Sequence, residues 1–257
     1  MNAVRLIPCL LLQGERLVKT IKFKSPTYIG DPRNAVRIFN DKEADELVLL
    51  DIDASRHRKQ PDPGLISEII SEAFMPVAFG GFITDVATAR TYFKVGMEKL
   101  VLNSAIADNH ELVTELAKEF GSQSIMASID AKRSLFGSYA VFTRGGTQRT
   151  TWTPADLARK YEEAGAGEIL INSIDRDGTL SGYDLELVKA VTSSVTIPVI
   201  SCGGARGVQD FETVIRDAGA SAASAGSCFV FQGKHRAVLI SFPTVAERKQ
   251  LASRCHL

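Results

Sequence analysis

The sequence predicts a closed (β/α)8 barrel built from two similar half-barrels, and three observations indicate this fold. The chain has 257 residues, and barrels of this class typically occupy about 250 residues as one domain. Short apolar runs alternate with amphipathic segments, as parallel strands joined by helices do. The first half of the chain also matches the second. We therefore expect a single domain over residues 1–257.

Each expected strand is a short apolar run in which apolar and polar residues alternate little. Such runs are typical of strands buried on both faces, with helices outside and packed side chains inside the barrel. Eight runs meet this description: residues 5–12, 46–52, 76–80, 99–103, 124–130, 168–174, 198–201 and 221–226. We expect each of these strands to be followed by a helix.

The segments between the strands carry helix signals. Asp31 precedes Pro32, and Thr153 precedes Pro154; a capping side chain followed by proline is typical of a helix start. Glycines that close two other segments favour helix ends there. The clearest helical segments are residues 31–44, 84–96, 109–121 and 153–166.

The internal match has a constant offset. Glu46 and Glu168 each begin a strand and lie 122 residues apart, as do Pro76 and Pro198. This period is far longer than that of a solenoid repeat and indicates duplication of a four-unit half. Related sites are therefore expected on opposite sides of the barrel.

Composition argues against several classes of partner. Thirty Lys and Arg residues balance 30 Asp and Glu residues, which removes the main electrostatic reason to expect a nucleic acid or a membrane surface as partner. No apolar run reaches the roughly 20 residues that span a bilayer, and the N-terminus lacks the features of a signal peptide. The four cysteines and four histidines show no metal-ligand spacing. We expect a cytoplasmic protein without metal or cofactor.

The predicted functional residues lie at the C-terminal ends of the strands, where barrels of this class hold their active sites. Glycine-rich ends let backbone N–H groups approach a phosphate. Two such ends related by the repeat predict an elongated substrate with a phosphate at each end, although the glycines could instead only turn the chain. The two sets are Gly81, Asn103 and Ser104, and Gly203, Gly204, Gly226 and Ser227.

Carboxylates at the same ends are candidates for acid–base chemistry. Asp130 closes a strand and is the best placed general acid or base. Asp175 and Asp177 lie in a glycine-containing loop, where aspartate is equally common as a turn residue. Asp51 is expected to hold the rim together by hydrogen bonds.

The opposite ends of alternate strands begin with charges. Arg5, Glu46, Lys99 and Glu168 occupy these positions. Since alternate strands supply alternate layers of inward side chains, the four could form a salt-bridged ring across the barrel floor. The other interpretation is four solvated residues at strand starts.

Taken together, these residues make the sequence resemble HisF, the cyclase subunit of imidazole glycerol phosphate synthase, over nearly the whole chain. The most specific segments are "DELVLLDIDAS" (45–55), "SIDAKR" (128–133), "GAGEILINSIDRDGTLSGYD" (165–184) and "GDP" (30–32). The resemblance implies a HisH-like glutaminase at the barrel bottom, whose ammonia passes a gate of the four charged residues and meets a phosphorylated substrate at the top. It also implies substrate-binding roles for Lys19, in a mobile loop after the first strand, and for Asp177 and Gly178.

The departures from the family gather at the top. Leu11 stands where the family has its second catalytic aspartate, Thr20 where it has glycine, and Phe82 where its phosphate loop has a third glycine. This pattern suits a paralogue that delivers ammonia to another acceptor, such as a sugar amidotransferase that builds an amidino sugar of a surface polysaccharide. The alternatives are a working cyclase of histidine biosynthesis, in which Asp130 acts with water or another carboxylate, and a non-catalytic scaffold that activates the glutaminase.

Overall fold

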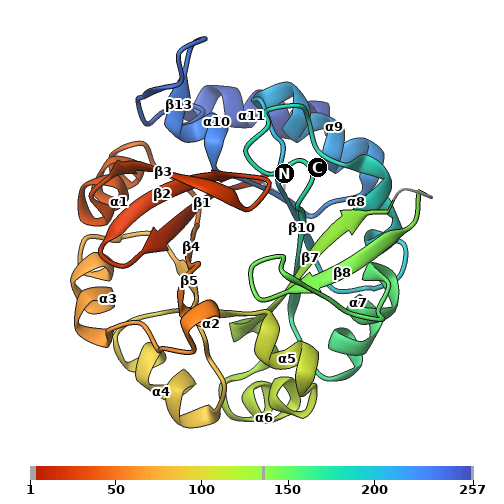
Figure 1. Ribbon diagram of the computed structural model, residues 1–257. Coiled ribbons are helices and arrows are strands. Elements are labelled where there is room, and N and C mark those ends of the chain that lie inside the picture. The colour runs from red at the N-terminus through yellow and green to blue at the C-terminus, as the bar shows by residue number, and fades with distance from the viewer. Residues whose placement is uncertain (1–3, 135–136, 256–257) are drawn as a thin grey trace.

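The computed structural model describes residues 4–134 and 137–255, so the ends of the predicted domain lie outside the described residues. Its centre is a closed barrel of eight parallel strands (Figure 1). The last barrel strand pairs with the first, for example Arg5 with Ala222, and this pairing closes the sheet. The predicted barrel is confirmed. Its strands are β1 (Arg5–Gln13), β4 (Leu47–Asp51), β5 (Val77–Gly80), β6 (Lys99–Leu102), β7 (Ile125–Arg133), β10 (Glu168–Ser173), β11 (Val199–Cys202) and β12 (Ala222–Ala225).

Helices surround the barrel and begin where the sequence signals predict. The Asp31 side chain accepts a hydrogen bond from the Asn34 N–H at the start of α1, and the Thr153 side chain caps α7 in the same way. Among the described residues, no helix is long and apolar enough to cross a bilayer. The outer helices are α1 (Pro32–Asp41), α3 (Pro63–Ile70), α4 (Val86–Lys94), α6 (Glu111–Phe120), α7 (Pro154–Glu163), α8 (Leu185–Thr192), α9 (Val208–Ala218) and α11 (Val245–Arg254).

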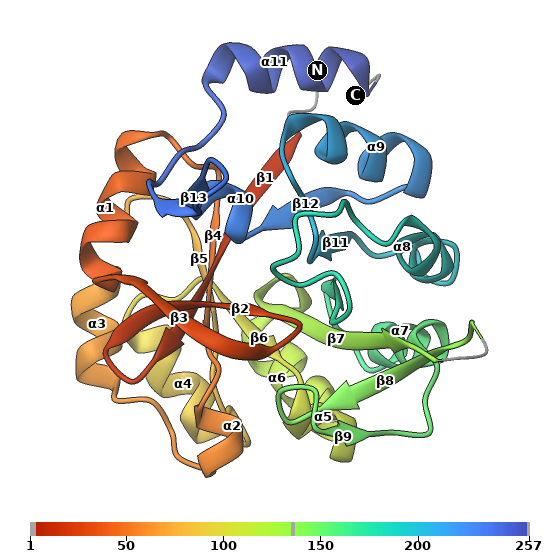
Figure 2. The ribbon, with the colours of Figure 1, turned by 45° about the horizontal axis from the view of Figure 1, so that its top comes forward.

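Each barrel strand is followed by a helix, as expected, but hairpins stand between the strand and the helix at two places. β1 extends past the barrel and pairs antiparallel with β2 (Arg16–Ile21), which pairs with β3 (Lys24–Gly30). β7 likewise pairs with β8 (Tyr139–Thr143), which pairs with β9 (Gln148–Arg149). The hairpins follow the first and the fifth barrel strands and lie across the same end of the barrel (Figures 1 and 2). Their equivalent positions agree with the two half-barrels.

Four short elements complete this end of the barrel. α2 (Ala54–His57) follows β4, α5 (Ser104–Asp108) follows β6 and α10 (Ser227–Val230) follows β12. A small hairpin of β13 (Phe231–Gln232) and β14 (Ala237–Val238) comes after α10. A 3₁₀ turn, Ser122–Ser124, precedes β7 at the other end.

The barrel interior follows from the period of two along each strand, because alternate residues point to the same face. On β1, the residues Arg5, Ile7, Cys9 and Leu11 follow one another along this face from the floor to the top. Every barrel strand contributes to the apolar layer in between. That layer contains Ile7, Val48, Ala78, Val101, Met126, Leu170, Ile200 and Ala222.

Candidate active site

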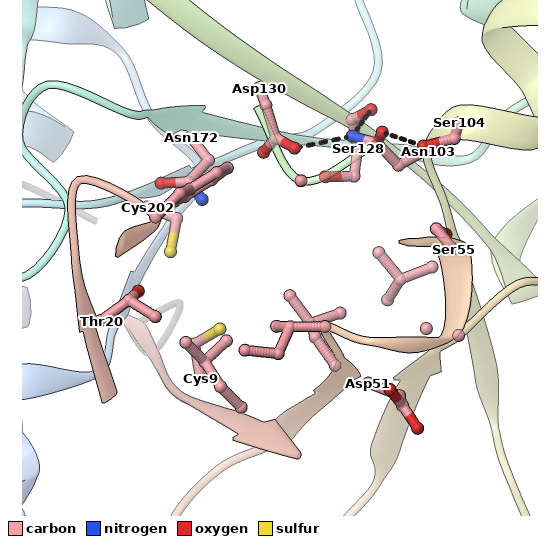
Figure 3. A pocket seen from close by; sticks show the side chains of 18 of the residues that line it. Cys9, Thr20, Asp51, Ser55, Asn103, Ser104, Ser128, Asp130, Asn172 and Cys202 are labelled. Carbon is pink, nitrogen blue, oxygen red and sulfur yellow. Dashed lines mark hydrogen bonds between the residues drawn. The ribbon is translucent and has the colours of Figure 1, made fainter. Parts of the chain in front are cut away.

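A cavity of about 520 Å³ lies at the C-terminal ends of the barrel strands. Its lining includes both predicted phosphate-binding sets and Asp130, although these residues come from separate barrel strands and the loops that follow them. Figure 3 shows how Asn103, Ser104 and Asp130 lie around it. A cavity of this size is typical of a small-molecule site. The predicted residues in its lining are Lys19, Gly81, Asn103, Ser104, Asp130, Asp177, Gly178, Gly203, Gly204, Gly226 and Ser227.

Asp130 is the buried carboxyl at the end of β7. Its Oδ2 accepts a hydrogen bond from Asn103 Nδ2 at 3.1 Å. Burial, reinforced by the negative charge of Asp177, raises the pKa of Asp130 to about 7, although the side chains of Asn103 and Asn172 oppose the rise. A carboxyl with such a pKa exchanges protons near neutral pH, as a general acid or base must.

Leu11 holds the equivalent place on β1 and gives the cavity an apolar wall. Leu11 begins the pairing of β1 with its hairpin, just as Asp130 begins the pairing of β7 with β8. Beside it on β4 lies Leu50, and both line the cavity. Of these two equivalent positions, therefore, only the one on β7 provides a proton-transfer group.

Lys19 is buried beneath the hairpin of β2 and β3. Its Nζ donates a hydrogen bond to the carbonyl oxygen of Cys9. The same ammonium lies against Gly226, where a Cβ atom would collide with it. Gly226 thus makes room for the lysine, and Lys19 lies next to the predicted phosphate-binding set that includes Ser227.

Asp177 fastens the hairpin of β2 and β3 over the cavity. Its Oδ2 accepts hydrogen bonds from Thr20 Oγ1 at 2.7 Å and from the Phe23 N–H at 3.0 Å. Its carbonyl oxygen accepts a third from the Lys22 N–H at 2.9 Å. The segment expected to be a mobile loop thus forms a hairpin, and these hydrogen bonds join it to the loop after β10. Burial raises the pKa of Asp177, and the two donors to its carboxylate oppose this rise.

The glycines predicted to cradle phosphate also serve close packing. Gly203 and Gly204 adopt φ of +89° and +107°, and a Cβ on Gly203 would lie 2.7 Å from Asn172 Oδ1. A Cβ on Gly178 would collide with the carbonyl of Thr20. These glycines therefore turn the chain and also line the cavity, and phosphate binding by them stays a prediction.

The first predicted phosphate set differs from the second. Phe82 has φ of +48°, a left-handed conformation that costs a residue with a side chain roughly 1–2 kcal/mol. The backbone thus keeps a shape that glycine adopts readily, but an aromatic ring now lines the cavity. Ser104 Oγ accepts a hydrogen bond from the Arg144 N–H at 2.9 Å and donates one to Asn103 Oδ1 at 3.2 Å. Its only proton is therefore already used.

Several lining residues were not predicted. Asn172 Oδ1 is buried and has no hydrogen-bond partner in the described part of the chain, which leaves an acceptor for a substrate. Asn172 lies four residues after Glu168, as Asn103 lies four after Lys99, so the strand period could have indicated it. Cys9 and Cys202 are buried, and both line the cavity (Figure 3). Their mutual hydrogen bond and their burial raise the pKa of Cys202 well above its usual value.

The other two aspartates considered accept hydrogen bonds from backbone N–H groups, and Asp51 also lines the cavity. Asp51 Oδ1 accepts hydrogen bonds from the N–H groups of Asp53 and Ala54, both at 2.9 Å, so it holds its own loop together. Asp175 Oδ2 accepts one from the Arg133 N–H at 2.9 Å. Asp175 is not among the residues that line the cavity.

The charged residues at the opposite end form a closed ring. Arg5 Nη1 lies 2.8 Å from Glu168 and 3.5 Å from Glu46, while Lys99 Nζ lies 2.8 Å from Glu168 and 3.2 Å from Glu46. The interpretation as four separate solvated residues is wrong, because both glutamates are buried. Burial raises the pKa of Glu46, and the charges of Lys99 and Arg5 oppose this rise.

Metal-binding clusters were sought over residues 4–134 and 137–255. No group of three or more His, Cys, Asp or Glu side chains in these ranges could hold a metal ion.

Comparison with known proteins gives one family. The model of the histidine biosynthesis protein family matches residues 5–236. A Pseudomonas aeruginosa protein, provisionally named imidazole glycerol phosphate synthase subunit hisF2, is 50% identical over 94% of this chain and 96% of its own length. A Vibrio vulnificus protein, provisionally named subunit hisF3 of the same synthase, is 45% identical over 96% of this chain and 95% of its own length. The imidazole glycerol phosphate synthase subunit HisF of Alkaliphilus metalliredigens is 42% identical over 88% of this chain and 89% of its own length.

Proposed function

Because the chain belongs to the histidine biosynthesis protein family, as a HisF-type subunit, we propose that it forms one barrel domain that receives ammonia from a HisH-like glutaminase. The glutaminase docks on the barrel floor around Arg5, Glu46, Lys99 and Glu168. Ammonia passes this gate and the apolar interior and leaves at the cavity. It must travel unprotonated, since protonation removes its nucleophilic lone pair, and a passage without bulk water favours the neutral form.

One observation supports this proposal above the others: the floor and the interior are complete while the cavity is altered. All four ion pairs of the ring are formed, and apolar residues from every barrel strand fill the layer above it. At the top, Leu11 replaces the second family carboxylate. Leucine neither transfers a proton nor stabilises a developing charge, and acid–base catalysis contributes on the order of 10²–10⁴-fold.

We further propose that the acceptor of the ammonia lies outside histidine biosynthesis. The chain supplies ammonia to a sugar amidotransferase that builds an amidino group, or to a phosphorylated small molecule in its own cavity. The retained ring and the lost carboxylate support this assignment together, because delivery needs the passage while cyclisation needs both acids.

A working cyclase is the second candidate, and Asp177 is the observation that favours it. Asp177 lines the cavity and is close enough for its charge to raise the pKa of Asp130. It could serve as the second carboxylate. Against this role, its Oδ2 already accepts two hydrogen bonds from the hairpin.

An ammonia-supplied cyclisation assay separates the two candidates. The purified protein receives an ammonium salt and the bis-phosphorylated substrate of imidazole glycerol phosphate synthase, and a HisF with both carboxylates serves as reference. We expect turnover at least about 100-fold slower than the reference. Turnover at the reference rate would establish the cyclase and refute the proposed change of acceptor.

A further inference from the structure

Three arginines line the cavity, and one of them, Arg56, lies against Gly145, the residue that follows Arg144. Arg56 and Arg58 belong to the segment of α2 after β4, and Arg144 belongs to the turn between β8 and β9. We call these three residues the arginine rim. Arg144 is fixed next to the first predicted phosphate set, because its N–H donates to Ser104 Oγ.

The backbone of the rim is strained. Arg58 and Arg144 both have φ of +52°, in the left-handed region that side chains disfavour. Phe82, which lines the same cavity, has φ of +48°. Strained residues persist where the surrounding structure holds them, and they concentrate at ligand-binding sites. Here both strained arginines line the cavity.

The guanidinium groups of Arg56 and Arg58 are available to a ligand. Both side chains are exposed, and within the described chain neither forms a hydrogen bond or an ion pair with an acidic group. The nearby carboxylates already have partners, since Asp51 accepts two backbone N–H groups and Asp53 accepts the side-chain amide of Gln13. Arg56 lies against Gly145, whose Cβ, if present, would be 3.0 Å from Arg56 Nε.

On the basis of the proposed function, we propose that the arginine rim binds a phosphoryl group of the cavity's substrate. Guanidinium groups present paired N–H donors that match phosphate oxygens. Phosphate binding by the neighbouring first predicted set is less favoured, because Ser104 already donates its hydroxyl proton to Asn103 and Phe82 places an aromatic ring in the glycine loop. Side chains from two loops would thus replace the backbone cradle, while Asp130 remains in the cavity for the reacting part of the substrate.

Chemical protection tests where the anion binds. The protein is treated with phenylglyoxal, which modifies guanidinium groups, in the presence or absence of inorganic pyrophosphate, and modification is located by mass spectrometry. We expect pyrophosphate to protect Arg56 and Arg58 and to leave Arg149, an exposed arginine that does not line the cavity, unprotected. Equal modification of Arg56 and Arg58 with and without pyrophosphate would overturn the proposal.

A binding measurement gives the energetic test. The double variant Arg56→Ala/Arg58→Ala should bind pyrophosphate at least about tenfold more weakly by calorimetry, since each lost charge-assisted bond weakens binding. Lys59→Ala is the matched control, because Lys59 is an adjacent exposed cation outside the cavity lining; its affinity should change less than twofold. Equal losses in the two variants, or none in either, would refute the proposal. Neither measurement involves ammonia or glutaminase, so failure here leaves the proposed ammonia delivery standing.

Discussion

Asp130→Asn should stabilise the protein, and more so as the pH rises. Asparagine has nearly the shape of aspartate and can still accept the hydrogen bond from Asn103, but it carries no charge. In the folded protein the pKa of Asp130 is about 7, raised from the usual 3.8 mainly by burial. The unfolded chain therefore releases this proton at a lower pH than the folded chain, so ionisation favours unfolding.

The size of the effect follows from the two pKa values. Near pH 4 the folded chain still holds the proton and the unfolded chain has lost it in part, so the variant gains only about 0.6 kcal/mol. At pH 5 the unfolded chain is already ionised, and we expect the variant to be about 2 kcal/mol more stable than the wild type. Above pH 7 both chains are ionised, and the advantage levels off at roughly 4 kcal/mol. The raised pKa that suits proton transfer thus costs stability.

Urea unfolding at pH 4, 5 and 8 measures this difference directly. Asp175→Asn is the matched control, because Asp175 lies outside the cavity lining. The reasoning is refuted if the stability curves of wild type and Asp130→Asn run parallel over this range. Parallel curves would mean that Asp130 titrates in the folded protein as it does in the unfolded chain.

Two further substitutions test the floor and the hairpin. Lys99→Ala removes the ion pairs with Glu46 and Glu168, so ammonia should leak to solvent and the ratio of glutamate formed to nitrogen incorporated should exceed one. The control Lys94→Ala, outside the barrel, should keep this ratio at one. An unchanged ratio in Lys99→Ala would contradict the proposed gate. Thr20→Val removes the hydroxyl that donates to Asp177, so exchange of the backbone amide hydrogens over residues 16–30 should accelerate about tenfold or more. Thr27→Val, at an exposed position of the same hairpin, is the control. Unaltered exchange in Thr20→Val would show that this hydrogen bond does not hold the hairpin.

Much of the site was predictable because strand alternation is local. A residue's place along a strand fixes the face to which it points. Along β10, every second residue after Glu168 points to the same face, first Leu170 and then Asn172. Along β6 the same spacing leads from Lys99 to Asn103. These steps lead from the charged floor through the apolar layer to the cavity. The floor, the interior and the carboxyl of Asp130 could therefore be located from the sequence.

The hairpin and its lysine could not be derived in this way. Nothing near Lys19 in the sequence indicates that its ammonium is buried against Gly226, because the barrel must close before β1 and β12 become neighbours. The bond between Thr20 and Asp177 joins residues 157 positions apart. These long-range contacts give the segment its hairpin form.

The sequence by itself indicated the barrel, its two halves and the four charges at the strand starts, since each depends on residue type and strand period. The ion pairs that join these four charges into a ring were seen only in the structure. Only the tertiary structure decided the protonation of Asp130 and the position of the arginine rim. The pKa of Asp130 depends on its burial and on the charge of Asp177, and Arg56 and Arg144 line one cavity only because separate loops converge there. Electrostatic energies depend on distance and burial in space, and these quantities exist only after the chain has folded.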